Sequence, residues 1–129
     1  MILVQLESAK SDIGFSIYAP PDIREYIDDL SSKDQNAILP LLAQLSTHGR
    51  LNNTEKCESE GDGVFALKPS QIRLVFFYDA VKRRVIIITH GYRKKSQKMP
   101  RKEFNKAVNF RTRYMRDLKA GRVEYDVVE

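Results

Sequence analysis

The chain has 129 residues, of which 42% are hydrophobic and 30% are charged, as expected for one globular domain rather than a disordered or multidomain chain. No apolar run approaches the roughly 20 residues of a membrane-spanning helix. The N-terminus MILVQLES also lacks the features of a secretion signal, so we expect no membrane partner.

A single cysteine, Cys57, excludes an internal disulfide and favours a reducing, cytoplasmic location. Its acidic neighbours disfavour a thiolate, so we expect no nucleophilic role for it. The two histidines and the cysteine are too scattered for a metal motif, and no cofactor is predicted.

The net charge of +5 conceals a strong segregation along the chain. Residues 1–81 hold 7 basic and 12 acidic side chains, whereas residues 82–122 hold 15 basic and 2 acidic ones. A solvated helix face is one interpretation, but such a face normally mixes both signs. The segregation therefore favours nucleic acid or an acidic protein as a partner.

The N-terminal part predicts two strands and a helix. MILVQLE (1–7) and GFSIYA (14–19) have the apolar content of short strands. Pro20-Pro21 then breaks the chain, and a helix is expected from Asp22. Its apolar residues follow helical spacing: Ile23, Tyr26, Ile27 and Leu30.

A second helix is predicted for residues 33–47, ending at Gly49. Pro40 lies inside it and should kink it. We expect the two helices to form an antiparallel hairpin. The buried stripe of the second helix would consist of Ile38, Leu42 and Leu45.

Residues 50–63 are polar and predict a loop. Three apolar runs follow: VFALK (64–68), IRLVFFYD (72–79) and RVIIITHG (84–91). They are too closely spaced for helical crossovers, so they predict a small antiparallel meander. The VIII segment is apolar on both faces, which is typical of a central strand covered on both sides.

A basic C-terminal helix is predicted from Pro100 to Gly121, with Arg111 at the edge of its apolar face. That face would consist of Phe104, Ala107, Val108, Met115 and Leu118. The predicted fold is therefore a single α+β domain spanning residues 1–129. It contains N-terminal strands, a helix hairpin, a small antiparallel sheet and the basic helix.

Three segments together carry a family resemblance: GDGVFALK (61–68), IRLVFFYD (72–79) and VIIITHGYRKKSQKMPRKEFNKA (85–107). Their order and motifs resemble the RelE/ParE toxin superfamily, most closely its phage-derived HigB-like branch, over about residues 20–118. The chain departs from that branch at Met99, where threonine commonly precedes the proline. It also has no clear counterpart of a catalytic tyrosine near the C-terminus.

The resemblance implies a RelE-like fold and the toxin of a type II toxin–antitoxin system. Such a toxin is a ribosome-dependent mRNA endonuclease, or mRNA interferase. It enters the ribosomal A site, contacts ribosomal RNA and cuts mRNA by metal-independent attack of the 2′-OH. The implied partner is a cognate antitoxin, usually a small helix-turn-helix protein.

The resemblance also implies that Arg73 and Arg93 contact the phosphate at the cleavage site. Arg73 lies on an otherwise apolar strand face, where a charge is either paired or functional. An ion pair with Asp79 or Glu103 is the structural alternative for it. Arg93 follows the strand-ending Gly91, and an exposed loop arginine is its alternative.

Lys68 and Tyr92 complete the candidate catalytic set. Lys68 would face the same groove from the neighbouring strand end, or would be simply solvated there. Tyr92 would stack on a base or act as general base, or would be an ordinary half-buried tyrosine. His90 is a general base by type, although a structural histidine is the stronger interpretation. His48 suits a helix C-terminus.

Between Arg93 and Lys102, six of ten residues are basic and none is acidic. We expect the cations that follow Arg93 to contact RNA phosphates without reading sequence. These candidate RNA-binding residues are Lys94, Lys95, Lys98, Arg101 and Lys102.

Three other functions remain open. One is a ParE-like inhibitor of DNA gyrase with the same fold. Another is a non-catalytic nucleic-acid-binding module. The third is a structural or phage-morphogenesis protein whose basic face meets an acidic partner.

Overall fold

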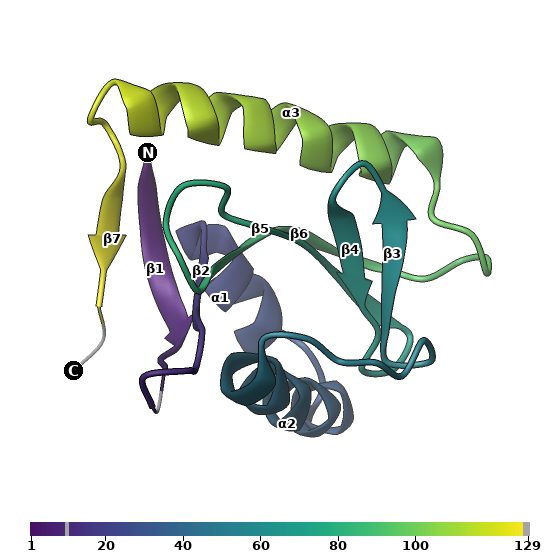
Figure 1. Cartoon of the computed structure of the whole chain (residues 1–129). Coiled ribbons are helices and arrows are strands. Elements are labelled where there is room, and N and C mark those ends of the chain that lie inside the picture. The colour runs from purple at the N-terminus through teal and green to yellow at the C-terminus, as the bar shows by residue number, and fades with distance from the viewer. Residues whose placement is uncertain (10, 128–129) are drawn as a thin grey trace.

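Two buried strands, β5 (Ile72–Tyr78) and β6 (Val85–Arg93), lie near the centre of a seven-stranded sheet (Figure 1). The computed structural model describes residues 1–9 and 11–127. The strand order is β3-β4-β5-β6-β2-β1-β7. The other strands are β1 (Ile2–Glu7), β2 (Ser16–Ala19), β3 (Cys57–Gly61), β4 (Val64–Leu67) and β7 (Glu124–Asp126). The prediction of a central strand covered on both faces is confirmed for β6.

The predicted antiparallel meander is present, but it is only half of a larger mixed sheet. Strands β3 to β6 pair antiparallel in chain order. On the other side of β6, β2 pairs parallel to it, β1 pairs antiparallel to β2, and β7 pairs parallel to β1. The predicted meander is therefore confirmed, but it is part of a larger, mixed sheet. A parallel neighbour requires a long crossover, here residues 20–84 between β2 and β6, and local patterns do not reveal such a pairing.

Two of these strands were not predicted, because neither has a strand-like sequence. Strand β3, CESEG, was expected to be part of a loop over residues 50–63, yet it pairs with β4 as an edge strand. Only Cys57 in it is buried, so its pairing depends on the hydrogen bonds of the ladder rather than on apolar alternation. Strand β7 has three residues and borders β1 at the opposite edge.

Three helices cover the two faces of the sheet (Figure 1). Helices α1 (Pro21–Asp28) and α2 (Ser32–His48) share one core cluster with the face that carries Leu74, Phe76 and Ile88. Helix α3 (Arg101–Lys119) packs on the other face, against Val75, Phe77 and Ile87. The sheet is thus the middle of three layers.

Local signals placed the second helix to within one residue at each end. The Ser31 hydroxyl accepts a hydrogen bond from the backbone N–H of Asp34 and caps α2. Gly49 ends the helix in the left-handed conformation with φ of 72°. Pro40 lies inside α2, as expected.

Helix α3 packs with the predicted apolar face, whose five residues lie in the clusters on that side of the sheet. Its fully buried residue Tyr114 was not predicted. Arg111 lies at the edge of the face, where its guanidinium donates to Asp62. Pro100 is the N-cap residue, without a side-chain cap, and the helix begins at Arg101.

Candidate functional site

Arg73 and Arg93 come to the same end of the sheet but lie on opposite faces. Strand β5 begins where β6 ends, so Arg73 is the cross-strand neighbour of Tyr92, and Ile72 is the neighbour of Arg93. Because successive side chains of a strand point to opposite faces, Tyr92 packs beneath α3 while Arg93 reaches α2. The two arginines therefore approach this end of the sheet from both sides.

Arg73 is 9% exposed and has no acidic partner at ion-pair distance among residues 1–9 and 11–127. Its Nη1 donates to the carbonyl oxygens of Ser70, at 2.8 Å, and Ile72, at 3.0 Å. The alternative ion pair with Asp79 or Glu103 does not form. Asp79 accepts hydrogen bonds from Tyr114 and the turn backbone, and Glu103 lies against His90.

The remaining nitrogens of Arg73 make no hydrogen bond with the described residues. Among the described residues, His90 Nε2 is the only side-chain nitrogen or oxygen that is fully buried without a hydrogen-bond partner. Nε and Nη2 of Arg73 also have no partner among these residues, so they are not fully buried and reach the surface. A largely buried cation that presents free N–H groups is well suited to receive an anion.

Arg93 is neither buried nor free. Its side chain is 56% exposed, and its Nη2 lies 3.1 Å from Oδ2 of Asp34 in the first turn of α2. Asp34 also accepts a hydrogen bond from the Ser70 hydroxyl at 2.9 Å. The hydrogen bonds from Ser70 and Arg93 lower the pKa of Asp34, so it is a carboxylate at neutral pH.

Ser70 consequently links the two arginines across the edge of the sheet. Its carbonyl oxygen accepts from Arg73, and its hydroxyl donates to Asp34, which holds Arg93. Sequence reasoning missed both Asp34 and Ser70. The Ser31 cap predicts the start of α2, but no local signal shows that this helix turn lies beside residue 93.

Lys68 follows β4 and is largely covered. Its Nζ donates to the carbonyl oxygen of Thr54 at 2.8 Å and lies 3.4 Å from Oε1 of Glu58. It is therefore not a freely solvated strand end. Desolvation by burial and the neighbouring Glu58 raise the pKa of Glu60, whereas the positive charges of Lys68 and Arg73 lower it. Lys68 and Arg73 thus act on a common acidic neighbour.

Tyr92 is half-buried, and its ring stacks on His90 with the centroids 6.2 Å apart. Burial, together with Glu60, raises its pKa. Tyr92 is therefore a phenol at neutral pH, which can donate a proton or stack on a base but is poorly suited to accept a proton.

His90 is buried at 4% exposure beneath α3. A bulge in β6 opposite Val75 brings Thr89 beside it, and the Thr89 hydroxyl lies 2.8 Å from His90 Nδ1. His90 Nε2 lies 3.2 Å from Oε1 of Glu103, but the alignment is outside that of a hydrogen bond. Burial, more than the effect of Lys106, lowers the pKa of His90 to about 4. These features favour the structural interpretation of this histidine.

Cys57 and His48 lie away from this end of the sheet, and their environments suit structural roles. Burial raises the pKa of the Cys57 thiol to about 11, which agrees with the absence of a nucleophilic role. His48 lies in the last turn of α2, as expected for a residue that favours a helix C-terminus.

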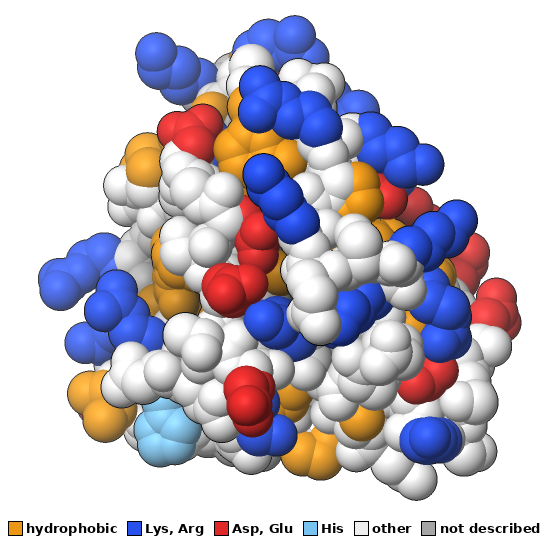
Figure 2. All heavy atoms as spheres, turned by 90° about the vertical axis from the view of Figure 1, so that its right-hand side faces the viewer, with side chains coloured by type: hydrophobic (Ala, Val, Ile, Leu, Met, Phe, Trp, Pro, Cys, Tyr) orange, Lys and Arg blue, Asp and Glu red, His pale blue; other side chains and the backbone are white. Residues whose placement is uncertain are grey.

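The predicted RNA-binding cations follow directly after β6 and continue into α3. Four are exposed, Lys94 is half-buried, and none is in an ion pair among the residues that the structure describes. Figure 2 shows Lys and Arg side chains spread over the face of the molecule that includes this region, with a few acidic side chains among them. The group consists of Lys94, Lys95, Lys98, Arg101 and Lys102.

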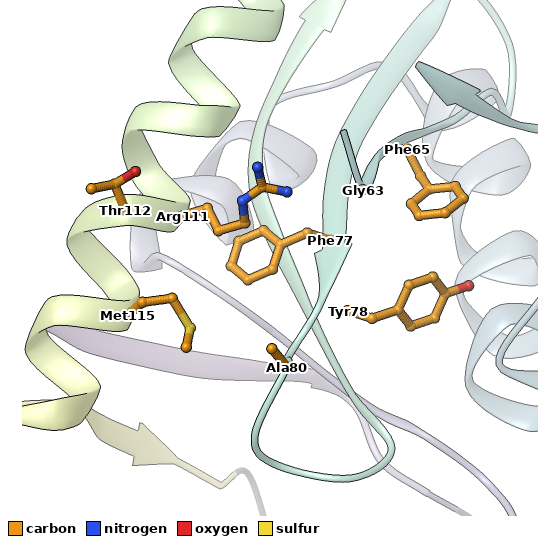
Figure 3. Close-up of a pocket in the computed structure, with 8 residues that line it drawn as sticks. All are labelled: Gly63, Phe65, Phe77, Tyr78, Ala80, Arg111, Thr112 and Met115. Carbon is orange, nitrogen blue, oxygen red and sulfur yellow. The ribbon is translucent and has the colours of Figure 1, made fainter. Parts of the chain in front are cut away.

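An apolar pocket lies elsewhere, between α3 and strands β4 and β5 (Figure 3). It has a volume of about 570 Å³, and its only charged lining residue, Arg111, is engaged by Asp62. Phe65, Phe77 and Met115 are among its lining residues. This chemistry suits an apolar side chain rather than a phosphate.

The mixed sheet with helices on both faces defines an α+β protein whose fold is RelE-like, and the chain is small and basic. The family of phage-derived Gp49-like proteins (DUF891) matches residues 25–112, which is more than half of the chain, and the chain belongs to this family. This family is described as one of toxin–antitoxin toxins of the RelE/HigB type. A comparison with curated proteins finds no match. Within the described residues, no helix combines the length and apolarity needed to cross a membrane.

Proposed function

We propose that this protein is the toxin of a toxin–antitoxin system and cuts mRNA on the ribosome. The observation that carries the proposal is the pair of arginines at one sheet end, where the largely buried Arg73 has free N–H groups and no acidic partner at ion-pair distance within the described residues. Burying an uncompensated cation costs stability, so its retention favours a functional role. Membership of the family supports the toxin class.

The proposed chemistry is a transesterification within the RNA. The ribose 2′-oxygen loses its proton and attacks the adjacent phosphorus, the bond to the 5′-oxygen breaks, and that oxygen takes up a proton. The products are a 2′,3′-cyclic phosphate and a 5′-hydroxyl. Arg73 and Arg93 would stabilise the negative charge that accumulates on the phosphate oxygens. Tyr92, as a phenol, would stack on a base or protonate the leaving oxygen.

Ser70 and Asp34 would act as positioning residues in this site. They hold the two guanidinium groups at a set separation before substrate arrives, which reduces the reorganisation that binding requires. The basic group from Lys94 to Lys102 would bind ribosomal RNA through its phosphates.

The test is primer extension on a defined mRNA in a reconstituted translation system, with and without ribosomes. We expect cuts only with ribosomes, and their loss in Arg73→Ala/Arg93→Ala. The control Arg116→Ala/Arg122→Ala removes the same charge from exposed positions near the end of α3 and should retain cleavage. Full activity of the first double variant would refute the assignment, and DNA breaks that depend on gyrase would instead indicate ParE-like action.

The same proposal includes an antitoxin, for which the apolar pocket beside α3 offers a contact surface. Lys82, Arg83 and Arg84 lie in the turn that carries the lining residue Ala80. An acidic, amphipathic antitoxin segment would match an apolar groove that adjoins this basic turn. Thr112→Glu places a negative charge at the groove and should weaken toxin–antitoxin binding measured by calorimetry, without altering ribosome-dependent cleavage.

A further inference from the structure

A second pocket lies beside the cationic sheet end and is not used by the proposed cleavage chemistry. It has a volume of about 480 Å³ and is formed by the end of β3, the connection after β6 and the first turn of α3. Its volume is in the range of pockets that bind small ligands. It is lined by Glu60, Ser96, Lys98, Met99, Pro100, Arg101 and Phe104.

One wall of this pocket is apolar and firmly supported. Met99, Pro100 and Phe104 are each half-buried, so part of each side chain faces the pocket. Met99 and Phe104 pack from behind against the cluster that contains Val75 and Ala107. An aromatic ring and apolar side chains held in this way form a platform on which a planar base can stack.

The rim of the pocket is cationic. Lys98 and Arg101 are exposed and make no ion pair with any residue in the ranges 1–9 and 11–127. Neither cation is therefore neutralised by the protein itself. They are available to the phosphates on either side of a base that enters the pocket.

Glu60 supplies the acidic group of the lining. It is half-buried and makes no ion pair at contact distance within the described residues. Burial and Glu58, which is also its side-chain hydrogen-bond neighbour, raise its pKa, whereas Lys68 and Arg73 lower it. A carboxylate is an acceptor only, and its two oxygens match two parallel N–H donors. A phosphate would be repelled by it, whereas the donor edge of a base would not.

We propose that this pocket binds an unstacked guanine of single-stranded RNA, with its ring on Phe104 and its N1–H and N2–H groups donating to Glu60. Guanine alone presents two adjacent donors on its Watson–Crick edge. Adenine and cytosine present one amino group beside an acceptor, and uracil presents one N–H between two carbonyl groups. This inference rests on the proposed RNA target and adds a preference for one base to it.

The test measures binding by the isolated full-length protein, without ribosomes. The probes are fluorescein-labelled hexamers UUUGUU, UUUAUU, UUUCUU and UUUUUU, followed by fluorescence anisotropy at about 50 mM salt, where phosphate binding is strong. We expect the guanine probe to bind at least about 5-fold more tightly than the others, the lower limit for one well-recognised base.

Two variants separate base recognition from electrostatics. Glu60→Gln removes the same charge as Glu58→Gln, and both change β3 outside the core. Only Glu60→Gln should abolish the guanine preference, because Glu58 is engaged with Lys68. Phe104→Leu should weaken all four probes to a similar extent. Equal binding of the four probes by the wild type, or an unchanged preference in Glu60→Gln, would overturn the inference.

The outcome is distinguishable from that of the proposed function. A guanine preference that depends on Glu60, in a protein that cuts no mRNA, supports the pocket and refutes the nuclease. Ribosome-dependent cleavage combined with equal binding of the four probes supports the nuclease and refutes the guanine pocket.

Discussion

Replacing Arg73 by methionine should make the protein more stable and inactive at the same time. Arg73 is 9% exposed, and its guanidinium donates to two carbonyl oxygens, from Ser70 and Ile72, without an acidic partner at ion-pair distance among the described residues. Desolvating an ion of this size costs several kcal/mol in real proteins. Methionine has a similar length, carries no charge and adapts to irregular space.

The magnitude follows from the opposing contributions. Losing two hydrogen bonds from a charged donor costs about 1.5–3 kcal/mol each in the buried limit. Exchanging buried ions for apolar side chains is nevertheless often neutral or stabilising by about 1–4 kcal/mol. Because Nε and Nη2 reach the surface, the desolvation relieved here is partial, and we expect a net stabilisation of about 1 kcal/mol. This corresponds to a rise in Tm of about 3–5 °C for a domain of this size.

Urea denaturation and primer extension on the same preparations test both expectations. Arg116→Met, at a side chain that is 67% exposed, is the matched control and should change the free energy of unfolding by less than about 0.5 kcal/mol. A destabilisation of more than about 1 kcal/mol in Arg73→Met would show that the arginine is structural. Retained cleavage would show that it is not part of the site.

Three further outcomes follow from the same structure. Tyr114→Phe should cost about 2 kcal/mol in urea denaturation, because the buried hydroxyl donates to the Asp79 carboxylate. Since the pKa of Tyr114 is raised, this contribution is present below pH 10 and should be lost as the pH rises above that value. His90→Gln should reduce the loss of stability between pH 7 and pH 5. The pKa of His90 is lowered to about 4, so the stabilisation from its neutral form is complete only above the ordinary pKa and declines as the pH falls. Lys95→Ala/Lys98→Ala should reduce the slope of log Kd against log salt for a single-stranded RNA hexamer by about 1.4, since each phosphate contact contributes about 0.7.

Each of these has an outcome that would contradict it. A Tyr114→Phe variant as stable as wild type would mean that water replaces its hydroxyl at Asp79. Parallel pH profiles for wild type and His90→Gln would mean that His90 is not held neutral. An unchanged salt slope in Lys95→Ala/Lys98→Ala would place the RNA phosphates elsewhere on the surface.

The candidate site was only partly predictable. The position of Arg73 on an apolar face and the cluster of charge after β6 both pointed to one end of the sheet. The link through Ser70 and Asp34, and the presence of Glu60 near Arg101, join segments far apart in the chain. Such contacts depend on how the elements pack, and hydrophobic periodicity carries no information about them.

The sequence by itself determined the elements whose signals are local. Helix α2 follows from the Ser31 cap and Gly49, and strands β5 and β6 follow from their apolar runs. The tertiary structure alone decided the polar edge strand β3, the parallel pairing of β2 with β6, and the faces on which Arg73 and Arg93 lie. The physical reason is that ladder hydrogen bonds and side-chain alternation depend on register between distant segments. The geometry of the candidate site depends mostly on those pairings.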